Sequence, residues 1–112
     1  MKEERPWGHF EVLLDEKGYK LKRLVVSPGK RLSYQSHSSR SEAWSVAKGE
    51  ALLTLDGRER KLYSGDMVLI GKKVKHRVEN IGADDLVIIE LQFGDRLSED
   101  DIIRYDDDYG RA

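Results

Sequence analysis

Four residues in the middle of the chain carry the side-chain chemistry of a metal site. Gln35 and His37 stand two apart in a segment that favours a strand, so a period of two places both side chains on one face. Glu42 follows after a gap that is long enough for a tight turn, and His76 lies on a later strand. Two imidazoles, one carboxylate and one amide oxygen suit a divalent ion with open positions for water or substrate. Gln35, His37, Glu42 and His76 are therefore candidate ligands of one divalent metal ion.

The same histidines also have a plainer interpretation. His37 and His76 could be ordinary surface or hydrogen-bonded histidines, and their spacing alone leaves both interpretations open. The chain has no cysteine, which excludes thiolate ligands, disulfides and cysteine nucleophiles. Any metal must therefore sit on nitrogen and oxygen atoms, and the candidates are Zn, Mn, Co, Ni, Fe and Mg.

Short strands must position these side chains. Apolar runs alternate with turn residues, and no long helical stripe precedes the final segment. The expected strands cover residues 9–14, 19–26, 31–37, 42–48, 51–55, 59–62, 67–70, 76–80 and 86–93. Many short strands joined by turns favour an all-β barrel or jelly roll. At the end of the chain, Ser98 and the acidic residues after it predict a short helix or turn over residues 98–103, outside the barrel.

Length and charge restrict the possible partners. A chain of 112 residues suits one domain, residues 1–112. Its 20 basic and 21 acidic side chains give a net charge of −1, which argues against nucleic acid or an anionic membrane as a general partner. No apolar stretch has the length of a signal peptide or a membrane helix, so the expected location is the cytoplasm.

The spacing around the predicted ligands matches a known motif. Gly29, Gln35, His37, Glu42 and Gly49 follow one another at the intervals of the first motif of the cupin superfamily, with Gln in place of its first His. The resemblance implies a cupin double-stranded β-helix, a jelly-roll barrel that encloses one metal ion.

A second segment resembles the other cupin motif. Gly65, His76 and Asn80 keep its intervals, whereas Gly71 replaces a Pro and Lys73 replaces a Gly. Both motifs lie in register in the middle of the chain, and together they are far more specific than either alone.

A narrower resemblance extends over almost the whole chain. Its segments are residues 5–8, 22–23, 28–33, 35–37, 40–44 and 99–111. They resemble type II phosphomannose isomerase, best known as the C-terminal cupin of bifunctional mannose-6-phosphate isomerase/mannose-1-phosphate guanylyltransferase. Gln35 agrees with this family, in which Gln is usual at that position. Ser38, Ser39 and Ala43 depart from it, because the family commonly carries further histidines around the motif.

The resemblance implies a stand-alone, metal-dependent isomerase that interconverts mannose 6-phosphate and fructose 6-phosphate. A bound metal would polarise the sugar oxygens and stabilise an enediolate. Glu90, on the same strand face as Gln92, is the candidate catalytic base, and a solvent-facing Glu90 is the alternative. The candidate substrate-binding residues are Lys22, Arg23, Arg31, Arg40 and Gln92, with the basic ones able to hold the phosphate.

Two other functions fit the same residues. One is a metal-cupin dioxygenase, and the other is a non-catalytic sugar-binding or regulatory cupin, since a fold does not fix its chemistry. A basic cluster beside the metal would favour the isomerase, an apolar cavity the dioxygenase, and a blocked or metal-free site the binding protein. The expected partners are a small-molecule sugar phosphate and a second copy of the chain, because a single barrel leaves edge strands that need covering.

Overall fold

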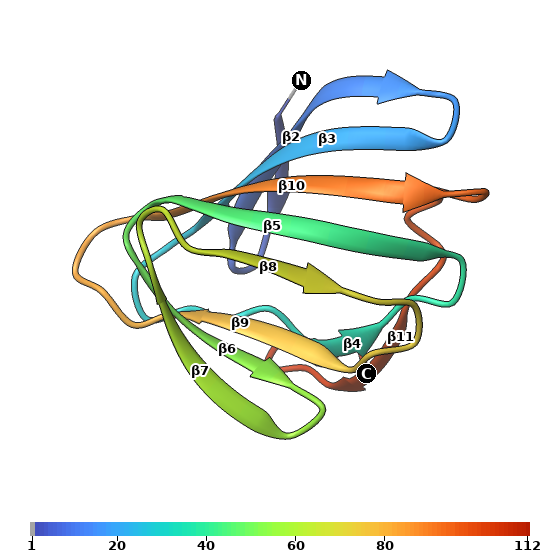
Figure 1. Ribbon diagram of the computed structural model, residues 1–112. Helices are drawn as coiled ribbons and strands as arrows, with labels where there is room; N and C mark the ends of the chain where they lie inside the picture. The colour runs from blue at the N-terminus through green and yellow to red at the C-terminus, as the bar shows by residue number, and fades with distance from the viewer. Residues whose placement is uncertain (1) are drawn as a thin grey trace.

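Two antiparallel sheets face each other in the computed structural model, which describes residues 2–112 (Figure 1). The six-stranded sheet has the order β1 (Lys2–Arg5), β2 (Gly8–Glu16), β3 (Tyr19–Val26), β10 (Leu86–Gly94), β5 (Arg40–Lys48) and β8 (Met67–Ile70). The five-stranded sheet has the order β11 (Ile103–Asp106), β4 (Tyr34–Ser36), β9 (His76–Asn80), β6 (Glu50–Leu55) and β7 (Arg58–Tyr63). This arrangement is the predicted all-β jelly roll.

The hydrophobic core lies between the two sheets. Inward and outward residues alternate along the long strands, so that each strand buries one face. The fully buried apolar side chains at its centre are Val26, Ala51, Leu53, Val78, Leu86 and Ile88. The alternation of inward and outward side chains is therefore enough to form the core between the sheets.

The hairpin between β6 and β7 is set by its turn residues. Asp56 and Gly57 have φ values of 44° and 82°, which is the positive-φ pair that a tight hairpin turn needs. The Asp-Gly pair therefore fixes the register in which Leu55 faces Arg58.

The end of the chain differs from the prediction. The turn is present, since the Ser98 hydroxyl accepts a hydrogen bond from the Asp100 amide at 3.1 Å, but no helix occurs among residues 2–112. The chain instead enters β11, where Ile103 pairs with Ser36 of β4. Pairing with an open sheet edge overrides the helix that the capping residue and acidic first turn predicted. Nor does this described part of the chain hold any helix with the length and apolar character of a membrane crossing.

Candidate metal centre

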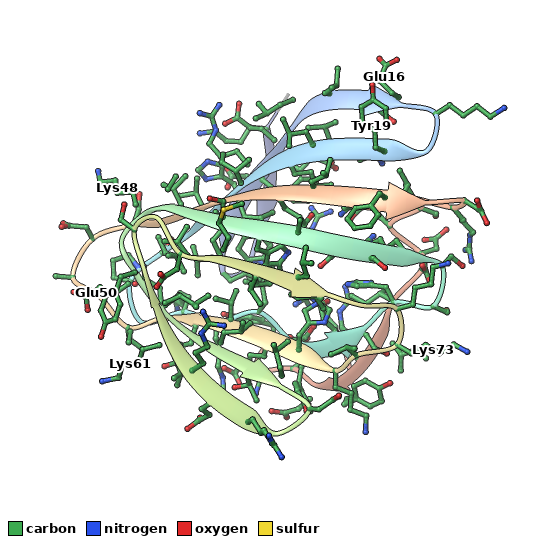
Figure 2. All side chains as sticks on the ribbon, in the orientation of Figure 1. Glu16, Tyr19, Lys48, Glu50, Lys61 and Lys73 are labelled. Carbon is green, nitrogen blue, oxygen red and sulfur yellow. The ribbon has the colours of Figure 1, made fainter. Side chains whose placement is uncertain are left out.

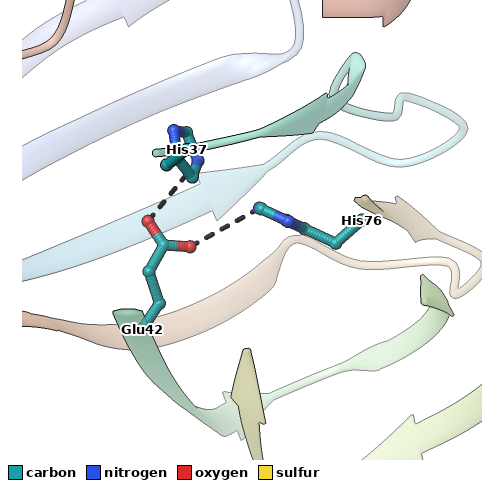
Figure 3. Close-up of side chains that lie close together, drawn as sticks. All are labelled: His37, Glu42 and His76. Atoms are coloured by element: carbon teal, nitrogen blue, oxygen red, sulfur yellow. Dashed lines mark ion pairs between the residues drawn. The ribbon is translucent and has the colours of Figure 1, made fainter. Parts of the chain in front are cut away.

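Three of the predicted ligands converge inside one end of the barrel. His37 follows β4, while Glu42 and His76 lie on β5 and β9, and Figure 3 shows both rings turned towards the Glu42 carboxylate. The Nε2 atoms of His37 and His76 lie 3.6 Å and 3.5 Å from the two Glu42 oxygens. All three side chains are buried, and the ligand atoms that they offer lie within 4.8 Å of one another. Three ligands from three separate segments of the chain thus surround one point.

Backbone carbonyls fix the tautomers of both histidines. The Nδ1 atoms of His37 and His76 lie 2.7 Å and 2.9 Å from the carbonyl oxygens of Asp101 and Val74. A carbonyl can only accept, so each Nδ1 carries the proton and each Nε2 presents a lone pair to Glu42. Burial and the charge of Arg40 lower the pKa of His37 to about 4, and burial also lowers the pKa of His76. Both rings are therefore neutral at pH 7, the state that binds metal.

The donor set fits a divalent cation. Within residues 2–112, neither Glu42 Oε1 nor His76 Nε2 has a hydrogen-bond partner, although both are buried. Gln35 lies directly opposite His76 in the register of β4 and β9, which brings its amide to the same face. Buried electron-rich atoms without a partner are costly unless a cation or a proton lies between them.

Arg40 is the positive charge already beside the triad. It is buried, and its Nε donates to Glu42 Oε2 at 2.8 Å while its Nη2 donates to His37 Nε2 at 3.2 Å. Desolvation nevertheless raises the pKa of Glu42, against the opposing charge of Arg40. The guanidinium therefore compensates one oxygen of Glu42 and leaves the other open.

Glu90 and Gln92 form the wall of the pocket beside the triad. The Glu90 carboxylate accepts hydrogen bonds from Trp44 Nε1 at 3.0 Å and from Gln92 Nε2 at 2.7 Å. Burial and the charge of Glu42 raise the pKa of Glu90 to about 7. Lys22 reaches the same pocket and pairs with Glu99. Glu90 thus faces the interior rather than solvent.

Two of the predicted substrate-binding residues lie elsewhere. Because side chains alternate along β3, Lys22 points inwards and Arg23 points outwards, where it pairs with Glu11 at 3.3 Å. Arg31 forms a bidentate pair with Asp108 and does not line the pocket. Of the basic candidates, only Lys22 and Arg40 reach the cavity.

The positions that depart from the family pattern do not face the triad. Asp101, a buried residue that sequence reasoning missed, accepts hydrogen bonds at 2.9 Å from the Ser38 amide, the Ser38 hydroxyl and the Ser39 amide. Ala43 lies on the outer face of its sheet, across from Leu69. A histidine at position 43 would therefore point away from the metal ligands.

The turn before His76 keeps its shape without the glycine of the motif. Lys73 has a φ of 65°, a conformation that glycine adopts more readily, and its amide donates to the His37 carbonyl at 2.7 Å. Figure 2 shows the Lys73 side chain extending outwards from this end of the barrel. The turn thus ties the two histidine segments together at some conformational cost.

Three guanidinium groups at the pocket mouth were also missed. They belong to Arg5, Arg104 and Arg111, which line the same pocket as His37. The segment from residue 99 to residue 111 was part of the family resemblance. The strand β11 was not predicted, however, so the sequence did not indicate that these residues lie at the pocket. The pairing of β11 with β4 is what brings it there.

Several proteins of known sequence or structure are similar to this chain. The mannose-1-phosphate guanylyltransferase of Salmonella montevideo is 40% identical over 107 residues, which are 96% of this chain and 23% of that protein. The enzyme of the same name from Escherichia coli strain K12 is 39% identical over 108 residues, with the same two shares. The cupin domain of Schizosaccharomyces pombe Cnp3 superposes with a TM-score of 0.75 at 11% identity, covering 78% of this chain and 64% of that one.

These relatives correct the expectation of a stand-alone mannose 6-phosphate/fructose 6-phosphate isomerase. They are enzymes named as guanylyltransferases, and this chain spans about a quarter of their length or less. The expected function is therefore wrong, because the chain matches only part of longer enzymes that are named for another activity.

The family itself is shown by a match over nearly the whole chain. Residues 1–107 fit the family model described as "Mannose-6-phosphate isomerase C-terminal". Together with the jelly roll and its cupin neighbour, this match shows that the chain belongs to the mannose-6-phosphate isomerase C-terminal family of cupin domains.

Proposed function

We propose that this domain binds a phosphorylated sugar through one divalent ion held by His37, Glu42, His76 and Gln35. The observation that carries the proposal is the convergence of two neutral Nε2 lone pairs on a carboxylate, where His76 Nε2 and Glu42 Oε1 have no hydrogen-bond partner among residues 2–112. A bound divalent ion would supply a Lewis acid for hydroxyl or carbonyl oxygens of the ligand.

Arg40 has a part in this proposal. Its Nη2 contacts the same His37 Nε2 that would bind the ion, so ion binding should release this arm of the guanidinium. The released arm is free to donate to a ligand oxygen, while Arg40 Nε remains on Glu42 Oε2. Arg40 is thus the proposed link between the ion and the ligand.

The lining of the pocket favours a phosphorylated sugar over an apolar ligand. Lys22 and Arg40 stand beside the polar side chains of Glu90 and Gln92, which argues against the apolar cavity of a dioxygenase. Relatives of the chain are named for mannose 1-phosphate, a ligand of this chemical class. We propose that Glu90 and Gln92 contact the bound ligand, because both line the same pocket as Lys22 and Arg40.

Elemental analysis tests the metal site. After loading with Mn²⁺ or Zn²⁺ and gel filtration, the wild-type chain should retain one ion per chain. The variants His37→Ala and His76→Ala should lose the ion. His9→Ala should keep it, because His9 pairs with Val25 of β3 and does not line the pocket. Unchanged metal content in both site variants would show that the assignment is wrong.

Calorimetry tests the ligand. The metal-loaded wild type should bind mannose 6-phosphate or mannose 1-phosphate more tightly than free mannose, and a chelator should abolish the binding. Equal affinity for the phosphorylated and free sugars, or binding that survives the chelator, would contradict the proposal.

We also propose that two copies of the chain pair through the outer face of the six-stranded sheet. A cross-strand row of apolar side chains crosses five strands there, formed by Leu69, Ala43, Leu91, Leu21 and Leu14. Leu69 is 75% exposed and Met67 beside it is 69% exposed. Five strands and their length give this face about 700 Å², close to the roughly 800 Å² that each partner of a stable complex buries.

Light scattering at micromolar concentration tests the pairing. The wild type should be a dimer, and Leu69→Lys should be a monomer because two buried ammonium groups would oppose each other. Tyr63→Lys, at a residue of β7 in the other sheet that is 50% exposed, should remain a dimer. A monomeric wild type would refute the proposal.

A further inference from the structure

Three guanidinium groups from opposite ends of the chain meet at the mouth of the metal pocket. Arg5 ends β1, Arg104 lies on β11, and Arg111 follows that strand. Burial and the charges of Arg111 and Arg5 lower the pKa of Arg104, while Asp107 opposes them. The fold thus holds three like charges near one another, an arrangement that costs free energy unless an anion joins them.

The pairing of β11 with β4 directs Arg104 into the barrel. Arg104 lies opposite Gln35, and directly paired residues of antiparallel strands share a face of the sheet. Gln35 is itself buried beside the metal ligands. The Arg104 side chain therefore lies on the same face as the metal centre.

The three arginines differ in how well they are neutralised. Arg111 forms a bidentate pair with Asp107, at 2.8 Å and 3.0 Å. Arg5 donates to the Glu4 carbonyl at 2.9 Å, has one long ion-pair contact of 3.9 Å with Glu3 and lies over the ring of Phe10. Arg104 forms no ion pair with any residue from 2 to 112, and its Nε is buried without a hydrogen-bond partner. One half-buried guanidinium is therefore left with a buried, unused Nε donor.

The other basic residues of the pocket are already engaged. Arg40 donates to Glu42 and His37, and Lys22 pairs with Glu99 and lies over the Phe10 ring. An incoming phosphate dianion needs donors that are free and close together. Among the cavity-lining cations of the described chain, Arg104 meets this requirement best.

We propose that Arg104, flanked by Arg5 and Arg111, is the subsite for the phosphate of the ligand. This inference rests on the proposed function, since it places the phosphate at the pocket mouth and leaves the sugar oxygens towards the His37, Glu42 and His76 centre. Guanidinium groups can grip two phosphate oxygens at once, so the subsite selects a dianion over a neutral sugar.

Calorimetry on the metal-loaded full chain tests the subsite with three probes: mannose 6-phosphate, mannose and inorganic phosphate. Arg104→Gln should weaken both phosphate-bearing probes by about 10- to 100-fold, as expected for a lost charge-assisted hydrogen bond. It should leave mannose binding and metal content unchanged. Arg5→Gln, which removes a flanking guanidinium that already donates to the Glu4 carbonyl, should give a smaller loss of the same kind.

A matched control separates the subsite from the general charge of the protein. Arg60→Gln removes the same charge from an exposed position on β7 and should leave all three affinities unchanged. Equal losses in Arg60→Gln and Arg104→Gln would overturn the inference. So would wild-type affinity for the phosphate-bearing probes in both Arg104→Gln and Arg5→Gln.

The outcomes also distinguish this inference from the proposed function. Metal-dependent binding of mannose 6-phosphate that is insensitive to Arg104→Gln would refute the subsite and leave the proposed function in place. Binding of inorganic phosphate that needs Arg104, in a chain that binds neither sugar nor metal, would support the subsite and refute the proposed function.

Discussion

The two ends of the barrel interior are built from the same strands but have opposite chemistry. On β5, Glu42 faces the metal centre, and Val46, four residues later, lies in the apolar core. On the antiparallel β10 the order is reversed, so Gln92 lies across from Glu42 and Ile88 lies across from Val46. One end of this pair of strands is therefore polar and the other apolar, although residues 42–46 and 88–92 keep the inward period of two.

Hydrogen bonding separates the two ends further. Asn80, a buried polar residue at the apolar end, is satisfied by bonds to the Val26 and Asp84 carbonyls and from the Gly82 amide. At the polar end, Glu42, His76 and Gln92 each keep a buried atom without a partner among residues 2–112. Satisfied polar groups are typical of structural positions, whereas buried unsatisfied ones call for a partner such as an ion or water.

The largest expected effect is at the apolar end. Leu53 is fully buried, so Leu53→Ala should lower the free energy of unfolding by about 2–5 kcal/mol through lost burial and a new cavity. Metal content should be unchanged, because the substitution lies outside the polar end. Urea denaturation and elemental analysis measure the two effects, and Leu13→Ala, at a site 44% exposed, is the control with a small loss. A loss of metal in Leu53→Ala would show that the two ends do not act separately.

The apolar end is also the part of the fold that could be predicted from the sequence. The strands β3, β8 and β9 have the predicted bounds, because alternation and turn residues both mark them. β1 and β11 were not predicted, since neither has an apolar face and both exist only through pairing with a neighbour. Pairing partners are distant in sequence and leave no periodic pattern.

The polar end could be predicted only in part. The cupin spacing indicated His37, Glu42 and His76, and the structure brings these residues together. Arg23 was a candidate because of its charge. Side chains alternate between the two faces of a strand, however, so Arg23 faces outwards while its neighbour Lys22 faces inwards. Arg104 and Asp101 act from a segment that sequence alone did not attach to the barrel, so their positions required the structure.

The next largest effect concerns Glu90 and pH. Its folded-state pKa of about 7 exceeds the ordinary 4.5, so its contribution to stability is full below pH 4.5 and is lost as pH rises to about 7. The unfolding free energy of the wild type minus that of Glu90→Gln should therefore fall by about 3 kcal/mol over this range.

Measuring a difference removes the larger part of the titration of the histidines. The lowered pKa values of His37 and His76 act in the opposite direction, since their contributions are lost as pH falls below their ordinary 6.5. Burial, the largest cause of both shifts, is common to the two proteins, whereas the smaller effect of the Glu90 charge on the histidines is not. Urea denaturation of the pair at pH 4.5 and pH 7 therefore reports mainly on Glu90. A difference that does not change with pH would mean that Glu90 is not a buried titrating group.

A smaller effect is expected at Asp101, which joins the final segment to the polar end. Its carboxylate accepts from the Ser38 and Ser39 amides, and its carbonyl orients His37. In Asp101→Asn, one carboxylate oxygen is replaced by an NH2 group, which cannot accept the hydrogen bond of a Ser38 or Ser39 amide. The segment should shift and misorient the His37 ring, so metal affinity should fall about tenfold. Asp100→Asn, at an exposed neighbour, is the control.

A double-mutant cycle separates positioning from general loss of stability. In a His37→Gln background, where an amide oxygen replaces the ring and leaves a weaker but measurable site, Asp101→Asn should cause no further loss of metal affinity, because no ring is left to orient. A tenfold loss that persists in this background would show that Asp101 acts by another route. Titration calorimetry with Mn²⁺ or Zn²⁺ measures all four proteins.

The smallest expected effect is a gain, at the turn that holds the polar end together. Lys73 adopts a φ of 65°, which costs a residue with a β-carbon about 1–2 kcal/mol. Its side chain is exposed, so Lys73→Gly should raise the free energy of unfolding by about 1 kcal/mol, after the greater chain entropy of glycine is subtracted.

Lys72→Gly is the matched control. This neighbour is also exposed but does not have a positive φ, so only the entropic cost applies and stability should fall. Urea denaturation of both variants measures the contrast, and a loss of stability in Lys73→Gly would mean that the turn carries no strain for glycine to relieve.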